Sequence, residues 1–113
     1  MKNVGTLTLP VVRGLVSEIL LVSEPELERA VNAFATLQKT MAEGAGAAGL
    51  AAMLGSPERF RGKKVGIVLC GGNIDSRILA SIMVRELERE HRVCAFRLTL
   101  NDQPGVLGRV ATR

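Results

Sequence analysis

The apolar positions of this chain recur every three or four residues over several stretches, which is the spacing of one face of an α-helix. The longest stretch follows Ser23, which has the spacing of a capping box with Glu26, and Pro25 suits the first turn of a helix. Its apolar stripe continues to Met41, so we expect a long helix there. Further helices are expected over residues 8–16, 45–54 and 76–91 and from residue 106 onward.

Three shorter apolar segments have the length of β-strands, namely residues 18–22, 64–69 and 93–100. The first two are apolar on both faces, as is typical of a parallel sheet, and the helices between them favour a right-handed crossover. The third alternates large apolar residues with polar or small ones, as antiparallel strands with one solvent-exposed face do. The pattern predicts an α/β fold with parallel strands over residues 1–92 and a different unit over residues 93–113.

Composition limits the size and the chemistry of the core. The 113 residues have room for one modest domain, and 47% of them are hydrophobic, with a mean hydropathy of +0.22. Because the chain has three Phe and no Trp or Tyr, aliphatic side chains must form the core. A chain this apolar is expected to cover part of its surface with a partner, and we predict a homo-oligomer.

The net charge of +4 and the isoelectric point near 9.7 raise the question of nucleic-acid binding. The densest basic run, residues 59–64, lacks interleaved aromatic residues, so a solvated surface turn is favoured and no nucleic-acid partner is predicted. Cys70 and Cys94 form no CxxC motif and the chain has one His, so we expect reduced thiols and no metal site. No run reaches the roughly 18 apolar residues of a membrane span, so a cytoplasmic location without a membrane partner is predicted.

The most informative segment is residues 66–75, where an apolar strand leads into Gly71 and Gly72 and then into a helix that Asp75 can cap. Paired glycines let bare backbone approach a flat or anionic ligand, so this turn is a candidate small-molecule site. Cys70 ends the predicted strand. From its position alone it is either a small buried hydrophobic residue or a ligand contact at the carboxyl edge of the sheet.

A second glycine motif, Gly44-x-Gly46-x-x-Gly49, matches the dinucleotide-binding fingerprint in its letters. That fingerprint requires a strand directly before it, whereas residues 37–41 are expected to continue a helix, so close packing of small residues is the favoured interpretation. Glu43 directly precedes this motif. Its carboxylate is expected to be partly buried and functional, and the alternative is a charge that interacts with a helix N-terminus.

Three segments, in this order and spacing, carry a family resemblance. They are Glu43-Gly44-Ala45-Gly46-Ala47-Ala48-Gly49-Leu50, Cys70-Gly71-Gly72-Asn73 and Asp102-Gln103-Pro104-Gly105-Val106-Leu107. Over almost its whole length the chain resembles the C-terminal part of the pyridoxal-phosphate-dependent threonine (serine) dehydratases, also called threonine ammonia-lyases. The resemblance implies a fold-type II enzyme of the tryptophan synthase β type. It also implies pyridoxal phosphate as cofactor and an amino acid as substrate, with L-threonine converted to 2-oxobutanoate and ammonia.

The resemblance further implies roles for individual residues. Cys70 takes the position of the Ser or Cys that lies against the pyridine nitrogen of pyridoxal phosphate, where a neutral thiol does not force the ring nitrogen into its protonated state. The Gly71-Gly72-Asn73 turn is implied to lie beside the ring. Gly5 and Glu43 fall in segments that pass near the cofactor in this family.

The segment from Asp102 to Leu107 and the alternating strand before it resemble the start of an ACT domain, a βαββαβ module that binds amino acids. An ordinary Pro-Gly turn is the alternative interpretation. Residues 93–113 would supply only the first strand and part of the first helix of such a domain. The edge of that strand would be open to pair with another copy.

Several catalytic motifs of the family do not occur in these residues. The lysines of the chain, Lys2, Lys39, Lys63 and Lys64, lack the Ser-Phe-Lys context of the lysine that forms the Schiff base. The glycine-rich phosphate loop and the Ser-x-Gly-Asn substrate loop are also missing. We therefore expect the chain to be inactive alone, as a catalytic-domain portion. The alternatives are a stand-alone module that binds an amino acid or cofactor, and an oligomerising interaction protein.

Overall fold

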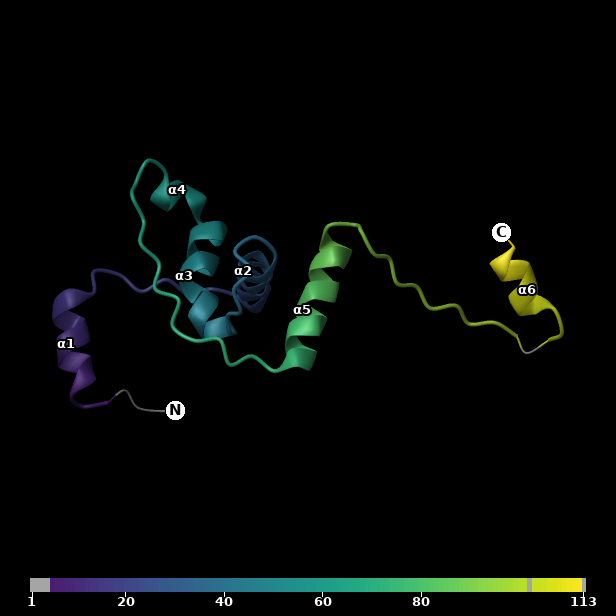
Figure 1. Cartoon of the computed structure of the whole chain (residues 1–113), viewed down its shortest axis with the longest axis horizontal. Coiled ribbons are helices and arrows are strands. Elements are labelled where there is room, and N and C mark those ends of the chain that lie inside the picture. Colours follow the sequence, from purple (N-terminus) through teal and green to yellow (C-terminus); the bar gives the residue numbers. More distant parts are fainter. Residues whose placement is uncertain (1–4, 102, 113) are drawn as a thin grey trace.

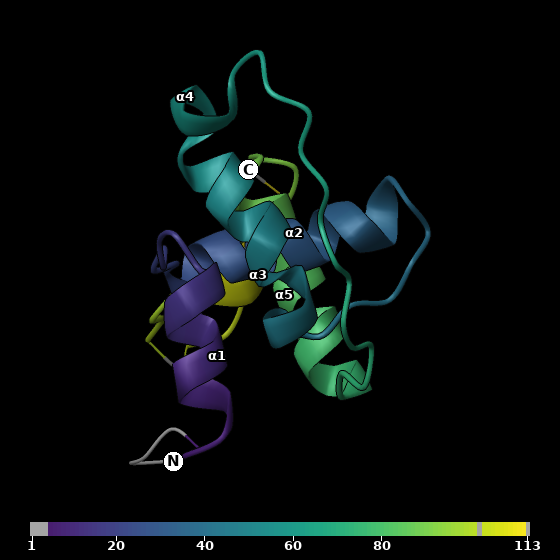
Figure 2. The ribbon, with the colours of Figure 1, turned by 90° about the vertical axis from the view of Figure 1, so that its left-hand side faces the viewer.

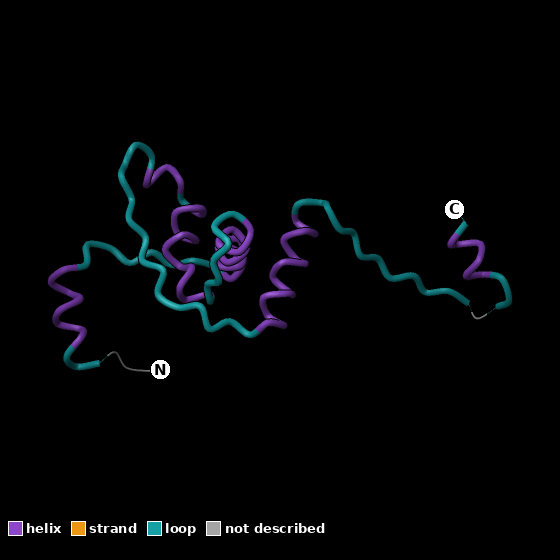
Figure 3. Tube along the Cα trace, in the orientation of Figure 1, coloured by secondary structure: helices purple, strands orange, loops and turns teal. Residues whose placement is uncertain are grey.

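The computed structural model describes residues 5–101 and 103–112, which form six helices joined by loops (Figures 1 and 3). Their bounds are Thr8–Leu15 for α1, Glu24–Thr36 for α2, Gly44–Gly55 for α3, Pro57–Phe60 for α4, Ser76–Arg89 for α5 and Val106–Ala111 for α6. The predicted helices are therefore confirmed, and the short α4 is an addition that the apolar pattern did not indicate. Asp102, the first residue of the ACT-like segment, lies outside the described residues.

The predicted strands behave differently. Within the described ranges no β-strand occurs, and residues 18–22, 64–69 and 93–100 run as loops (Figure 3). A strand requires a neighbouring backbone to complete its hydrogen-bond ladder, and none of these three segments has one in the described part of the chain. The parallel sheet and the strand that would open an ACT-like unit are thus not confirmed by this structure.

Two helix starts follow the local signals in the sequence. At the start of α2, the Glu26 carboxylate accepts hydrogen bonds from the amide of Ser23 at 2.6 Å and from its hydroxyl at 2.8 Å. At the start of α5, Oδ1 of Asp75 accepts a hydrogen bond from the amide of Arg77 at 2.8 Å. The predicted capping box and the predicted Asp75 cap are both confirmed.

The end of α2 was predicted wrongly. The helix stops at Thr36 and does not continue to Met41. Lys39 adopts a left-handed backbone with φ of 56°, and the amide of Thr40 donates a hydrogen bond to the carbonyl oxygen of Phe34 at 3.0 Å. This arrangement closes the C-terminus of the helix even though the apolar stripe in the sequence runs on.

The core is small and lies along α2, which packs against α3 and against α5. These helices gather near the centre of the view down the long axis (Figure 2). The buried apolar residues are Ala30, Val31, Ala42, Ala47, Ala51 and Ile82. Because four of these six are alanine, the helices approach closely but bury little apolar area.

The rest of the chain extends away from this core (Figure 1). The radius of gyration is 20.8 Å, whereas a compact domain of this length has about 13 Å. Neither α1 nor α6 packs against another helix of the described chain, and Leu15 and Leu107 are 82% and 73% exposed. No helix in residues 5–101 or 103–112 has both the length and the hydropathy to span a membrane.

Candidate functional site

The glycine turn after Cys70 lies against the segment that leads into α3. The amide of Glu43 donates a hydrogen bond to the carbonyl oxygen of Gly71 at 3.2 Å. Gly71 has a φ of +140°, and a Cβ there would lie 2.7 Å from Oε1 of Glu43. A Cβ on Gly72 would lie 2.9 Å from the carbonyl oxygen of Met41. Gly71 is required by its backbone conformation, and Gly72 by the close approach of another backbone.

The structure brings most of the predicted site residues together. Glu43 is half-buried and contacts the Gly71-Gly72 turn, and Asn73 lines the same pocket as Glu43. Cys70 directly precedes the turn, and its thiol is exposed and free of any disulfide, so its interpretation as a buried hydrophobic residue is wrong. Gly5 is not part of this cluster. It lies before α1, a helix that packs against no other described helix.

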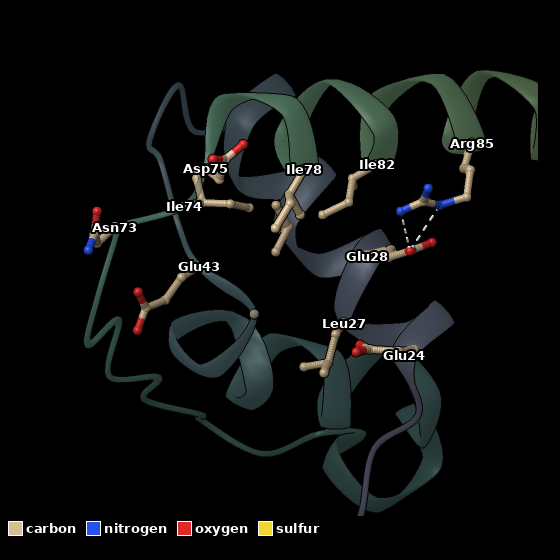
Figure 4. Close-up of a pocket in the computed structure, with 12 residues that line it drawn as sticks. Glu24, Leu27, Glu28, Glu43, Asn73, Ile74, Asp75, Ile78, Ile82 and Arg85 are labelled. Carbon is tan, nitrogen blue, oxygen red and sulfur yellow. Dashed lines mark hydrogen bonds and ion pairs between the residues drawn. The ribbon is translucent and has the colours of Figure 1, made fainter.

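A pocket of about 380 Å³ opens beside the turn, between α2 and α5 (Figure 4). Its apolar lining consists of Leu27, Val31, Ile74, Ile78 and Ile82. Its charged lining consists of Glu24, Glu28, Glu43, Asp75 and Arg85. Four carboxylates against one guanidinium make this pocket unfavourable for a phosphate group.

Ion pairs between α2 and α5 close one end of the pocket (Figure 4). Oε1 of Glu28 accepts hydrogen bonds from Arg85, at 2.9 Å from Nε and 2.6 Å from Nη2. Oε2 of Glu28 accepts a hydrogen bond from Nη2 of Arg89 at 2.6 Å, and Arg89 also donates to the buried Glu86. The hydrogen bonds from Arg85, and secondly the one from Arg89, hold the pKa of Glu28 below its usual value against the opposing effect of burial.

This ion-pair cluster was not predicted from the sequence. The available signal was the pair Arg85 and Arg89 on one face of a helix, four residues apart, together with a carboxylate on another predicted helix. Nothing local identifies which carboxylate faces them, because Glu28 lies 57 residues before Arg85. The cluster became visible only when the packing of α2 against α5 was known.

The motif Gly44-x-Gly46-x-x-Gly49 lets α3 pack closely against the loop that contains Ile67 and Gly71. A Cβ on Gly49 would lie 2.9 Å from Cγ2 of Ile67, and Gly46 meets the backbone of Gly71. In Figure 2 this loop descends alongside α3. Residues 37–43, which precede the motif, form a turn and a loop, so the strand that a dinucleotide-binding fingerprint requires is not there.

Cys70 would offer its exposed thiol to one edge of a pyridoxal phosphate ring. The sides of Gly71 and Gly72 that lack a Cβ face Glu43 and Met41, so a flat ring would have to approach the turn from another side. The phosphate group of a bound cofactor would have to lie away from this turn, because the nearby carboxylates of Glu43 and Asp75 would repel it. In the described part of the chain, no group of three His, Cys, Asp or Glu side chains is placed to hold a metal ion.

Comparisons with known proteins point to the same chemistry. A family model described as pyridoxal-phosphate dependent enzyme matches residues 1–71. The chain is 39% identical over 111 residues to an L-threonine ammonia-lyase of Geobacter sulfurreducens and 38% identical over 106 residues to one of Thermotoga maritima. It is also 38% identical over 82 residues to an L-threo-3-hydroxyaspartate ammonia-lyase of a Pseudomonas species.

The extent of these matches is uneven. They cover 98%, 94% and 73% of this chain, but 28%, 26% and 26% of the three relatives, in the same order. The chain therefore spans about a quarter of the length of the curated relatives that it matches. No solved structure matches the chain.

Proposed function

We propose, because the chain belongs to the family of pyridoxal-phosphate-dependent enzymes, that residues 70–73 contact one edge of the cofactor ring in an enzyme of the threonine ammonia-lyase type. The proposed reaction of the whole enzyme converts L-threonine to 2-oxobutanoate and ammonia. Residues 1–92 would be the C-terminal portion of its catalytic domain, and residues 93–113 the start of an ACT-like unit. The relatives named L-threonine ammonia-lyases support the choice of amino acid substrate.

The observation that carries this proposal is the geometry of the turn. The exposed thiol of Cys70 stands beside two glycines, and the Glu43 amide holds the carbonyl group of Gly71 at 3.2 Å. When bound, the cofactor supplies a ring that withdraws electrons from the amino acid. The thiol donates only a weak hydrogen bond and so leaves the ring nitrogen unprotonated, which suits loss of a β-hydroxyl group. Asp75 then begins α5, where its side chain accepts a hydrogen bond from the amide of Arg77.

A titration of the purified chain with pyridoxal phosphate tests the proposal. We expect saturable changes in the NMR amide signals of Gly71, Gly72 and Asn73, with unchanged signals for Gly62 and Gly108, which do not line the pocket beside the turn. Reduction with borohydride should not attach the cofactor selectively to any one lysine, because the lysines of this chain lack the motif in which the family places its Schiff-base lysine. No saturable change at millimolar cofactor would contradict the proposed contact.

A second candidate is a stand-alone module that binds a free amino acid. The pocket between α2 and α5 favours this candidate, because it combines an apolar lining with carboxylates and a guanidinium. Saturable shifts of the Ile78 and Ile82 amides with L-threonine, without turnover and without any effect of pyridoxal phosphate on Gly71, would support it.

A third candidate is an interaction protein that assembles through its apolar surface. The exposed side chains of Leu7, Leu21 and Phe96 favour it, at 86%, 94% and 77% exposure. A native mass well above 12.1 kDa that does not depend on any ligand would support this candidate and the predicted homo-oligomer.

A further inference from the structure

The start of α3 and the glycine turn approach each other backbone to backbone. Gly46 is buried in the first turn of α3, and a Cβ on it would lie 2.6 Å from the carbonyl oxygen of Gly71 and 3.3 Å from its amide nitrogen. Real Cβ atoms essentially never come within 3.0 Å of such a neighbour. An alanine at position 46 must therefore displace the turn, because a backbone carbonyl group cannot rotate away as a side chain can.

Two further contacts join the same segments. The carbonyl oxygen of Gly71 also accepts the hydrogen bond from the Glu43 amide at 3.2 Å. One residue later, a Cβ on Gly72 would lie 2.9 Å from the carbonyl oxygen of Met41. We name these five residues, Met41, Glu43, Gly46, Gly71 and Gly72, the backbone clasp.

We propose that Gly46 is a positioning residue for the turn that faces the cofactor. Its missing side chain lets α3 come close enough for the Glu43 amide to hold Gly71, and this sets where Cys70 stands relative to α3. Gly46 acts through the turn, since its contact is with the Gly71 backbone. The inference rests on the proposed function, because the turn matters for catalysis only if it contacts the ring.

Gly44 provides a matched control in the same helix. It lies two residues before Gly46, and a Cβ on Gly44 would meet nothing within 4 Å. Gly44→Ala and Gly46→Ala make the same chemical change and both favour helix formation by propensity. They differ in the contact with the turn, so a difference between the two variants reports on the backbone clasp.

Amide hydrogen exchange in the full chain without cofactor tests the clasp directly. We expect Gly46→Ala to raise the exchange rate of the Glu43 amide by about tenfold or more, because its hydrogen bond to Gly71 is lost. Gly44→Ala should leave that rate unchanged, and circular dichroism should show the same helix content for both variants. Equal protection of the Glu43 amide in both variants would overturn the inference.

A second pair of variants applies if Gly46→Ala does not fold. Gly72→Ala brings a Cβ against the Met41 carbonyl oxygen from the other side of the clasp, whereas a Cβ on Gly66 in the same loop would meet nothing within 4 Å. We expect Gly72→Ala, and not Gly66→Ala, to raise exchange of the Glu43 amide by about tenfold. The inference fails if Gly72→Ala leaves this amide as protected as Gly66→Ala does.

Cofactor titrations separate the positioning role from the proposed function. We expect Gly46→Ala to raise the dissociation constant for pyridoxal phosphate by about tenfold, with Gly44→Ala unchanged. If Gly46→Ala loses protection at Glu43 but binds the cofactor as the parent chain does, the positioning role is wrong. If the parent chain itself does not bind, the proposed contact fails, and the clasp is then judged by hydrogen exchange alone.

Discussion

The carboxylate of Glu28 in α2 is held by two arginines of α5, and its closest contact with Arg85 is 2.6 Å from Oε1 to Nη2. The Glu28 side chain is only 16% exposed, so these are charge-assisted hydrogen bonds in a partly dry environment. They span 57 residues of chain for Arg85 and 61 for Arg89, and they lie beside Ile82, the buried residue of α5 that joins the apolar core. The ion pairs therefore fix α5, and with it the segment that follows the glycine turn, against α2.

Replacing Glu28 by Gln should destabilise the helical core. Arg85 loses its charged partner and Arg89 keeps only Glu86, so the free energy of unfolding should fall by about 1–2 kcal/mol. Urea denaturation followed by circular dichroism measures this change. Glu88→Gln is the matched control, since Glu88 is exposed on α5 and makes no ion pair among the described residues. Equal losses in the two variants would show that the Glu28 ion pairs contribute nothing to stability.

The same carboxylate gives stability a specific pH dependence. The pKa of Glu28 is lowered from its usual value of 4.5 in the folded chain, mainly by the hydrogen bonds from Arg85. Above pH 4.5 the Glu28 carboxylate is charged in both the folded and the unfolded chain, so its ion pairs stabilise the fold fully. Below it the unfolded chain binds the proton first, and stability falls as the pH drops toward the lower folded pKa. Urea midpoints measured from neutral to acid pH should fall less steeply for Glu28→Gln than for the parent chain.

Truncating Val31 should lower the free energy of unfolding more than truncating an exposed valine. Val31 is the largest side chain that is completely buried, and Val31→Ala should lower the free energy of unfolding by about 2 kcal/mol. Val84 in α5, a helix that packs against α2, is 49% exposed, and Val84→Ala is the control because both substitutions change helix propensity equally. Thermal unfolding of the two variants gives the comparison. A similar midpoint for both would mean that the apolar cluster around α2 does not govern unfolding.

The features that could be predicted from the sequence depend on near neighbours. Ser23 with Glu26 and Asp75 with Arg77 bond across three and two residues, so their capping could be recognised from spacing alone. The strands could not be established in this way, because an apolar run such as residues 64–69 becomes a strand only beside a second backbone. The candidate turn at Cys70 could be found from its glycines, whereas the role of Gly46 depends on how closely α3 approaches that turn.

The central claim is that Cys70 faces the ring of the cofactor, and the chain contains its own control for testing it. Cys70 and Cys94 are both exposed and free, so a small alkylating reagent should modify both in the folded chain. Pyridoxamine 5′-phosphate is a suitable probe, because it keeps the ring nitrogen and the phosphate but has no aldehyde to react with lysines.

The decisive measurement is the rate of alkylation of each cysteine, by mass spectrometry, with and without saturating pyridoxamine 5′-phosphate. If the ring lies against Cys70, its alkylation should slow by about tenfold, because only the free fraction of the chain reacts. Alkylation of Cys94 should not change. Unchanged rates at both cysteines, or an equal decrease at both, would contradict a specific contact between Cys70 and the cofactor ring.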